Sequence, residues 1–244
     1  MLIFIHGLCN VPDAWGHMIS FFSSVGYSCT APDLRKGLDL RRNRVADYVE
    51  KIEGMVSKED VVIGHSLGGL IAQKIAEEKN IRAAVAVCSA PPRGIAMDIP
   101  LSDMLPALRY LPHVLLNKPF KPSYSLAKNL FLAGMTVDEE KHSLKEYEKL
   151  GTDSALVMRE LVMHRPVVDE QKVGCPLLFI AGKRDKICSP TTVKQMAEKY
   201  HAEYQEYDCC HHFFINRNWD EVARGIQDFL LRHNVRPIEK DSNK

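Results

Sequence analysis

The stretch that most constrains the fold is "DVVIGHSLGGLIAQ", residues 60–73. It holds a Gly-x-Ser-x-Gly core centred on Ser66, directly after a buried-strand run and directly before a helical pattern. A serine on so sharp a turn has crowded neighbours two residues to either side, so Gly64 and Gly68 are needed there. The N-terminus of the following helix favours developing negative charge. This context predicts Ser66 as a nucleophile; the alternative is a helix entry whose glycines serve only packing.

The rest of the chain alternates short apolar runs with segments of helical period. The runs typical of strands are residues 2–5, 27–32, 60–64, 83–90, 176–182 and 202–208. Helical spacing follows at 192–201 and 219–233, and the last of these opens with Asn218 and Glu221 in capping-box positions. Strand–helix alternation is the signature of a mostly parallel sheet with helices on both faces. We therefore expect an open α/β fold of about six strands.

Residues 93–172 interrupt this alternation. They contain no convincing strand, but several helical stretches separated by proline, with Thr136 and Glu139 placed to form a capping box. An insertion of this length is too long for one structureless loop. We expect two parts: an α/β core made of residues 1–92 and 173–244, and a helical cap, 93–172, over one end of the sheet.

Apolar residues of this expected cap have two explanations. They either line a pocket for an acyl group or pack the cap helices onto the core. The residues concerned are Met104, Leu105, Leu108, Leu115 and Leu116.

A serine hydroxyl is a weak nucleophile unless a base takes its proton, and the base needs a carboxylate to fix its tautomer. Asp185 lies in "AGKRDKICSP", just beyond the predicted strand 176–182, and His211 and His212 follow the last strand in the same relation. Open α/β sheets place active groups at these carboxyl ends. The order Ser, Asp, His is the one expected for a serine on a strand-to-helix turn. The sequence predicts a triad of Ser66, Asp185 and one of the two histidines.

The run "YDCCHHFFI" also raises a metal site and a disulfide as alternatives. Four consecutive side chains diverge, whereas zinc sites space their ligand pairs by two or more residues. A disulfide between Cys209 and Cys210 would close a strained ring. We expect neither a metal nor a disulfide there.

Four segments carry a resemblance to a known family. The stretch "FIHGLCNVPDAWGHMISFFSSVGYSCTAPDLRKG" resembles the oxyanion-loop strand, first helix and second strand of α/β-hydrolases, and "GHSLGG" resembles their nucleophile elbow. "AGKRDKICSP" is similar to their acid loop and "CHHFF" to their histidine loop. The resemblance covers most of the chain and is to the capped sort, which includes small esterases, lipases and carbon–carbon bond hydrolases.

The resemblance implies roles for particular residues. In such families the catalytic histidine commonly follows glycine and precedes an aromatic residue; His212 precedes Phe213, so it is the expected base, with His211 as the second candidate. The oxyanion hole is expected at the backbone N–H groups of Leu8 and Leu67. The chain begins at the strand that family members usually place third, so the sheet is expected to lack the usual N-terminal hairpin.

The function that the resemblance implies is serine-dependent cleavage of a carboxylic ester through an acyl-enzyme, without a cofactor. One alternative is an acyl thioester such as acyl-CoA, because the first part of the expected cap carries cations for phosphates. These are Arg93, Arg109, Lys118, Lys121 and Lys128. Carbon–carbon or lactone hydrolysis is another alternative. A binding protein on the same scaffold is the alternative from a different class.

Composition excludes other classes of partner. With 32 Lys+Arg against 31 Asp+Glu, the net charge of +1 gives no reason to expect nucleic acid or an acidic membrane surface. We see no apolar run long enough to span a bilayer, and the start "MLIFI" is too short for a secretion signal. Seven cysteines without a CxxC pair suit reduced thiols. We expect a cytoplasmic protein with a small-molecule substrate, and the sequence does not indicate an oligomeric state.

Overall fold

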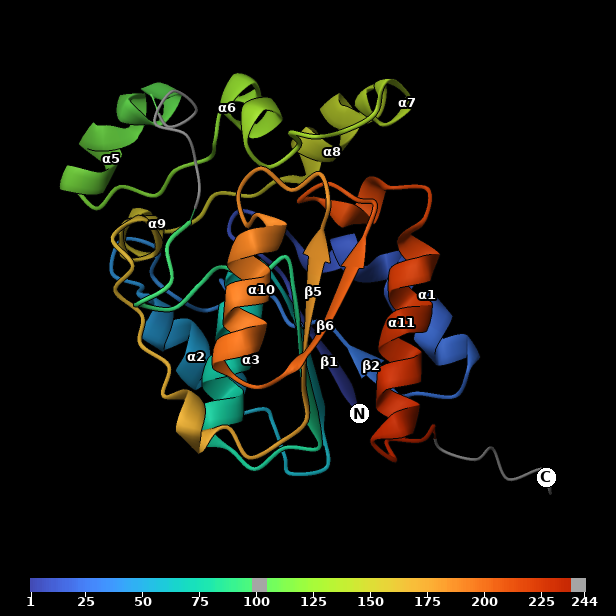
Figure 1. Cartoon of the computed structure of the whole chain (residues 1–244). Helices are drawn as coiled ribbons and strands as arrows, with labels where there is room; N and C mark the ends of the chain where they lie inside the picture. The colour runs from blue at the N-terminus through green and yellow to red at the C-terminus, as the bar shows by residue number, and fades with distance from the viewer. Residues whose placement is uncertain (98–104, 238–244) are drawn as a thin grey trace.

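A single parallel sheet forms the centre of the computed structural model, which describes residues 1–97 and 105–237 (Figure 1). The six strands lie in the order β2-β1-β3-β4-β5-β6, and all five pairings are parallel. Their bounds are β1 (Leu2–Ile5), β2 (Cys29–Thr30), β3 (Val61–His65), β4 (Ala83–Val87), β5 (Leu177–Gly182) and β6 (Glu203–Tyr207). The prediction of an α/β fold with about six strands is confirmed.

Helices cover both faces of this sheet (Figure 1). The core elements are η1 (Pro12–Trp15), α1 (Gly16–Ser24), α2 (Val45–Glu53), α3 (Leu67–Glu78), α10 (Pro190–Lys199), η4 (Phe213–Ile215) and α11 (Trp219–Arg232). A further turn, η3 (Glu170–Lys172), ends the expected insertion and contacts α3. Helices α2, α3 and α10 pack on one face, and α1 and α11 pack on the other.

The first strand shows why its sequence is apolar throughout. Side chains alternate across a strand, so a strand with helices on both faces must be apolar at every position. Ile3 and Ile5 pack toward α2 and α3, whereas Leu2 and Phe4 belong to the opposite cluster. In that second cluster the ring centroids of Phe4 and Trp15 lie 5.0 Å apart. The sheet is therefore held by a core on each face.

Helices α5 to α8 of the expected insertion lie beyond the carboxyl ends of the strands, above them in Figure 1. Apart from η3, the insertion's described elements are η2 (Leu105–Tyr110), α5 (Leu111–Leu115), α6 (Tyr124–Asn129), α7 (Val137–Glu140), α8 (Ser143–Lys149) and α9 (Ala155–Val162). Within its described residues, β pairing is limited to one isolated bridge between Phe120 and Asp153. The insertion thus lies at the edge of the sheet where parallel strands present functional groups.

The two predicted capping boxes have different outcomes. At the start of α7, the Glu139 N–H donates to Thr136 Oγ1 at 3.3 Å and the Thr136 N–H donates to Glu139 Oε2 at 2.6 Å, which confirms the first. At α11, the side chain of Asn218 makes no capping bond, so the second prediction is wrong. Asn218 Nδ2 donates instead to the carbonyl of Asp208, 3.3 Å away. That contact takes the side chain away from the helix end.

Four leucines near the start of the insertion do not pack inward. Leu105, Leu108, Leu115 and Leu116 are each between 57% and 69% exposed, so the expectation that they pack onto the core is wrong. None of them lines the small cavity beside Ser66 described below, and their role in an acyl pocket stays a prediction. Met104 lies outside the described residues.

The chain's seven cysteines are all free thiols. None of the helices in the described ranges has both the length and the apolar character needed to span a bilayer.

Candidate active site

Ser66 is the single residue between β3 and α3, on the sharp turn that joins them. Its backbone is strained, with φ 55° and ψ −117°, a region that non-glycine residues rarely adopt. Strand β4 holds the turn in place: the Ser66 N–H donates to the carbonyl of Val87 at 3.1 Å, and the Ala90 N–H donates to the carbonyl of Ser66 at 3.0 Å. A strained residue fixed in this way is a structural reason to expect function there.

The two glycines around Ser66 are required by close backbone approach. A Cβ on Gly64 would lie 1.9 Å from the carbonyl oxygen of Gly68, and a Cβ on Gly68 would lie 2.2 Å from that of Ile5. Real Cβ atoms do not approach other atoms this closely, so any side chain would push α3 away from the sheet. The glycines of the motif permit this turn geometry, which leaves Ser66 half-buried.

Asp185 follows β5 and is a buried hydrogen-bond acceptor. Its Oδ1 accepts hydrogen bonds from the N–H groups of Ile187 at 2.8 Å and Cys188 at 3.0 Å. Its Oδ2 lies 2.8 Å from Nδ1 of His211, and both side chains are at most 2% exposed. Because an ionised carboxylate only accepts, the proton of this hydrogen bond is on Nδ1 of His211. The other ring nitrogen, Nε2, therefore carries a free lone pair for a proton.

The two candidate histidines have different partners. His211, and not His212, meets Asp185. His212 Nε2 lies 3.6 Å from Oε2 of Glu146, on α8 of the insertion. The adjacent side chains diverge because His212 begins η4, and because Nε2 of His65 donates to the His211 carbonyl at 2.8 Å and fixes the peptide between them. The spacing of residues in the sequence does not predict this contact of His65 with the His211 carbonyl.

Burial determines the charge of the remaining groups here. Burial and the nearby rings of His211 and His212 lower the pKa of His65, so it is a neutral donor. Burial also lowers the pKa of His212, against the opposing effect of Glu146. Although burial raises the pKa of Glu146, the contact with His212 and the hydrogen bond from Lys149 at 2.6 Å bring it to about 2. Glu146 is ionised, and His212 beside it is neutral.

Ser66, His211 and His212 line one small cavity of about 10 Å³. Its other walls come from the loop after β1 and from two apolar residues of the insertion, Phe131 and Leu150. No sequence pattern pointed to Phe131 or Leu150, because they reach the cavity beside Ser66 only through the tertiary fold. The cavity brings together the predicted nucleophile and both histidines.

The loop after β1 carries one of the two expected oxyanion donors, Leu8. This loop lies against the nucleophile, because a Cβ on Gly7 would lie 3.1 Å from the Cβ of Ser66. His6 supports it: Nδ1 donates to the carbonyl of Gly7 at 2.9 Å, and Nε2 accepts the N–H of Leu34 at 3.1 Å. With both nitrogens engaged, His6 is a support of the loop and not a base.

The second expected donor, Leu67, is the first residue of α3. First-turn N–H groups of a helix have no partner within the helix, and the helix dipole makes that end positive. The Leu67 N–H is adjacent to Ser66, as an oxyanion donor must be.

Asp185, His211 and Cys188 also have ligand atoms within 4.8 Å of one another, a spacing that a metal ion would accept. The chemistry of the donor set does not suit one. Burial and the charge of Asp185 raise the pKa of the Cys188 thiol, and a protonated thiol is a poor ligand. A metal ion would also displace the hydrogen bond between Asp185 and His211.

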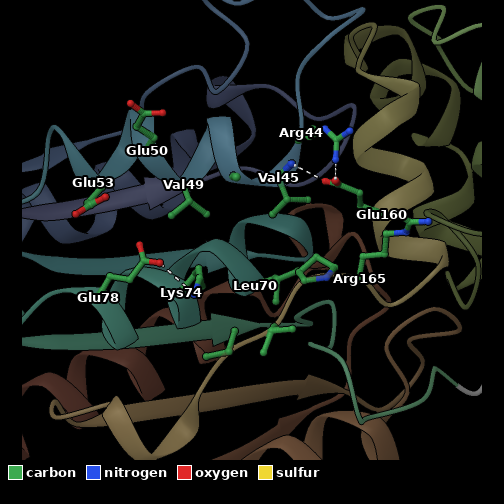
Figure 2. A pocket seen from close by; sticks show the side chains of 14 residues that line it. Arg44, Val45, Val49, Glu50, Glu53, Leu70, Lys74, Glu78, Glu160 and Arg165 are labelled. Atoms are coloured by element: carbon green, nitrogen blue, oxygen red, sulfur yellow. Dashed lines mark hydrogen bonds and ion pairs between the residues drawn. The ribbon is translucent and has the colours of Figure 1, made fainter.

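A larger cavity of about 460 Å³ lies elsewhere, between α2, α3, α9 and residues 165–168 (Figure 2). Figure 2 shows two ion pairs among its lining residues: Glu160 with Arg44 at 3.4 Å, and Lys74 with Glu78 at 3.1 Å. Neither Ser66 nor Asp185 nor a histidine lines it. Cavity size alone would therefore place the reactive site wrongly.

Comparisons with known proteins identify the family and the fold. The model of the alpha/beta hydrolase family matches residues 2–225. A search of curated proteins gave no significant match.

Solved structures share the fold at low sequence identity. An enol-lactonase from Burkholderia xenovorans LB400 is 16% identical with a TM-score of 0.73, covering 94% of this chain and 90% of its own. A structure from a study of carboxylesterases of Nitrososphaera gargenis is 17% identical with a TM-score of 0.71, covering 96% and 90%. A lipase-esterase related protein from Clostridium acetobutylicum is 18% identical with a TM-score of 0.70, covering 93% of each chain.

The family model matches nearly the whole length of the chain, from residue 2 to residue 225. The chain therefore belongs to the α/β hydrolase family.

Proposed function

We propose that the protein is a serine hydrolase that cleaves carboxylic esters. The observation that carries the proposal is the buried 2.8 Å hydrogen bond between Asp185 and His211, in a site whose cavity is also lined by Ser66. Burial of a carboxylate and an imidazole lowers the stability of the folded state, and so does a strained backbone at a serine. Their combination at the carboxyl edge of the sheet supports catalysis over binding.

The chemistry follows from the protonation states. Nε2 of His211 takes the proton of the Ser66 hydroxyl as its oxygen attacks the ester carbonyl, and Asp185 stabilises the imidazolium that forms. The N–H groups of Leu8 and Leu67 bind the oxyanion. His211 then gives the proton to the leaving alkoxide, which departs as the alcohol. Water, activated by the same imidazole, releases the acid and restores Ser66.

An oxygen ester is favoured over an acyl-CoA thioester by the state of the expected phosphate-binding cations. Lys128 forms an ion pair with Glu140, Lys121 Nζ donates to the carbonyl of Glu148 at 3.4 Å, and Arg109 donates to Ser123 Oγ at 3.5 Å. These three cations already have partners. A lactone is a cyclic ester and fits the same steps, in line with the enol-lactonase among the structures of the same fold.

The insertion acts as a cap in this proposal. A cavity of about 10 Å³ is roughly the space of one water molecule, whereas sites for small organic ligands measure about 300–1,000 Å³. Phe131 and Leu150 close the cavity from the insertion's side. Admission of an ester therefore requires these two side chains to move away from Ser66.

The test uses the purified protein, a fluorophosphonate probe and p-nitrophenyl acetate. The probe should label Ser66 covalently, and Ser66→Ala should abolish labelling and reduce kcat by about 10⁶-fold. A protein that binds ligands without catalysis would show neither labelling nor turnover. Turnover by Ser66→Ala near that of the wild type would end the proposal.

The adjacent histidines supply a matched pair of variants. His211→Ala should lose nearly as much activity as Ser66→Ala, because it removes the base. His212→Ala removes a ring from the same cavity wall but not the proton acceptor, so its loss should be far smaller. A larger loss in His212→Ala than in His211→Ala would contradict the assignment of His211.

A further inference from the structure

A buried carboxylate in the insertion contacts the loop that carries the expected oxyanion donor. Asp153 is completely buried and accepts three hydrogen bonds. Its Oδ2 accepts the backbone N–H of Cys9 at 2.8 Å, and Cys9 directly follows Leu8. Its Oδ1 accepts the Tyr48 hydroxyl at 2.6 Å and the N–H of Ser154 at 2.8 Å. One side chain thus links the insertion, α2 and the loop after β1.

Cys9 is held by the same segment on its other side. The Gly151 N–H donates to the carbonyl of Cys9 at 2.7 Å, so both polar backbone groups of Cys9 bond to residues 151–153. Cys9 also has φ 60°, the left-handed region that a residue with a Cβ disfavours. Such a conformation persists only when its surroundings hold it. The two hydrogen bonds from residues 151–153 are contacts that hold it.

The identity of the side chain at 153 fits this task. Three donors converge on it, and only a group without donors of its own satisfies all three. A carboxylate also makes stronger bonds to backbone N–H groups than a neutral acceptor does. Arg35 lies beside this segment, with Nη1 donating to the carbonyl of Thr152 at 3.3 Å, and brings a positive charge near the buried carboxylate.

We propose that Asp153 is a positioning residue for the oxyanion loop: by fixing the N–H of Cys9 it orients the preceding peptide and hence the N–H of Leu8. The inference rests on the proposed function for its catalytic consequence. Asp153 does not line the cavity beside Ser66, so it acts through the loop and not on the substrate.

Asp153→Asn is the informative variant. The amide has one oxygen for three donors, and two of them, Tyr48 and Ser154, meet at the position of Oδ1. The amide oxygen therefore stays there, and the NH₂ group is turned toward the N–H of Cys9. The substitution breaks the contact with the loop and keeps the other two.

Two measurements on Asp153→Asn test the inference, steady-state kinetics and amide exchange. The kcat for p-nitrophenyl acetate should fall by about 100-fold while KM changes by less than about threefold, because a displaced oxyanion donor affects the transition state more than substrate binding. By NMR, hydrogen–deuterium exchange of the Cys9 amide should accelerate by about tenfold or more. A merely structural role would lower stability without the split between kcat and KM.

Ser154→Ala is the matched control on the neighbouring residue. It removes the Ser154 Oγ bond to the carbonyl of Asn43, 2.7 Å long, and the side-chain cap of α9, but keeps the N–H that Asp153 accepts. It should lower the melting temperature and leave both kcat and the Cys9 exchange rate at wild-type values.

The outcomes separate the inference from the function. An Asp153→Asn protein that folds with unchanged kcat, or with unchanged Cys9 exchange, overturns the inference. If wild-type protein shows no turnover that depends on Ser66, the proposed function fails, while the exchange rates still decide whether Asp153 holds the loop. If Asp153→Asn does not fold, hydrogen–deuterium exchange of the wild-type protein tests the inference. The Cys9 amide should then exchange as slowly as the amides of β3. Exchange as fast as that of an unprotected loop amide overturns the inference.

Discussion

Replacement of Asp185 by Asn tests the protonation state on which the proposed chemistry depends. Oδ1 of Asp185 accepts two backbone N–H groups, those of Ile187 and Cys188. In Asp185→Asn the amide oxygen stays with these two donors, so the NH₂ group faces Nδ1 of His211. Nδ1 must then accept a hydrogen bond, and the ring proton moves to Nε2. The lone pair needed to take the proton of Ser66 is lost.

The magnitude follows from that change of tautomer. A serine triad with the wrong tautomer loses about 10⁴-fold in kcat. At about 1.4 kcal/mol per factor of ten, this corresponds to about 5–6 kcal/mol of activation free energy. The free energy of unfolding should change far less, because the amide oxygen keeps both backbone hydrogen bonds and the amide fills the same volume as the carboxylate.

Steady-state hydrolysis of p-nitrophenyl acetate, together with thermal denaturation, measures both quantities. Glu146→Gln is the matched control, since it makes the same carboxylate-to-amide change beside His212. It should lose less than about tenfold in kcat, a range typical of residues outside the proton-transfer path. The reasoning is refuted if Asp185→Asn keeps kcat within tenfold of the wild type, or if Glu146→Gln loses as much.

Two further predictions concern stability. In Gly68→Ala the new Cβ would lie 2.2 Å from a carbonyl oxygen of β1, so this variant should lose about 2–3 kcal/mol of unfolding free energy in urea titrations. Gly174→Ala is the control: no atom lies within 4 Å of its new Cβ, so its unfolding free energy should change by less than about 0.5 kcal/mol, and equal effects of the two substitutions would contradict the steric account. Burial raises the pKa of Glu139, but hydrogen bonds, chiefly from Arg184 at 2.9 Å, bring it down to about 2 from 4.5. Because the folded pKa is depressed, its stabilisation is complete above about pH 4.5 and is lost as pH falls toward 2. Melting temperatures measured across this window should fall less steeply for Glu139→Gln than for the wild type, and Glu148→Gln at an exposed position should follow the wild type.

The fold was accessible from the sequence because burial dictates composition locally. A strand covered on both faces must be apolar at every position, so the runs at β1, β3, β4 and β5 stand out. The turn at Ser66 was accessible for a related reason, since its close approaches admit only glycine at 64 and 68. Asp185 was identified as a candidate because it lies just beyond the end of a predicted strand. In each case the constraint lies within a few residues of the chain.

The parts that sequence reasoning missed depend on contacts between distant residues. Asp185 selects His211 over His212 because His65, 146 residues earlier, holds the intervening peptide. Asp153 meets Cys9 across 144 residues. No local pattern encodes such pairs. The exposed leucines of the insertion, such as Leu108 and Leu115, show a different limit. Their apolar character is plain from the sequence, but the sequence pattern does not determine whether they pack against anything.

Three buried carboxylates assemble the site, and a physical reason connects them. The active loops leave strands at their carboxyl ends, where backbone N–H groups lose their sheet partners and need other acceptors. Asp185 satisfies N–H groups of its own loop and orients His211.

Asp153 satisfies the N–H of Cys9 in the loop after β1. Glu139 binds Arg184 of the acid loop and also accepts from Asn216, whose Oδ1 in turn accepts the N–H of Cys210 at 3.2 Å. Two of the three carboxylates, Asp153 and Glu139, come from the insertion. The insertion therefore fixes the loops around Ser66 as well as covering them, so its removal should disorder the oxyanion and histidine loops rather than merely open the cavity.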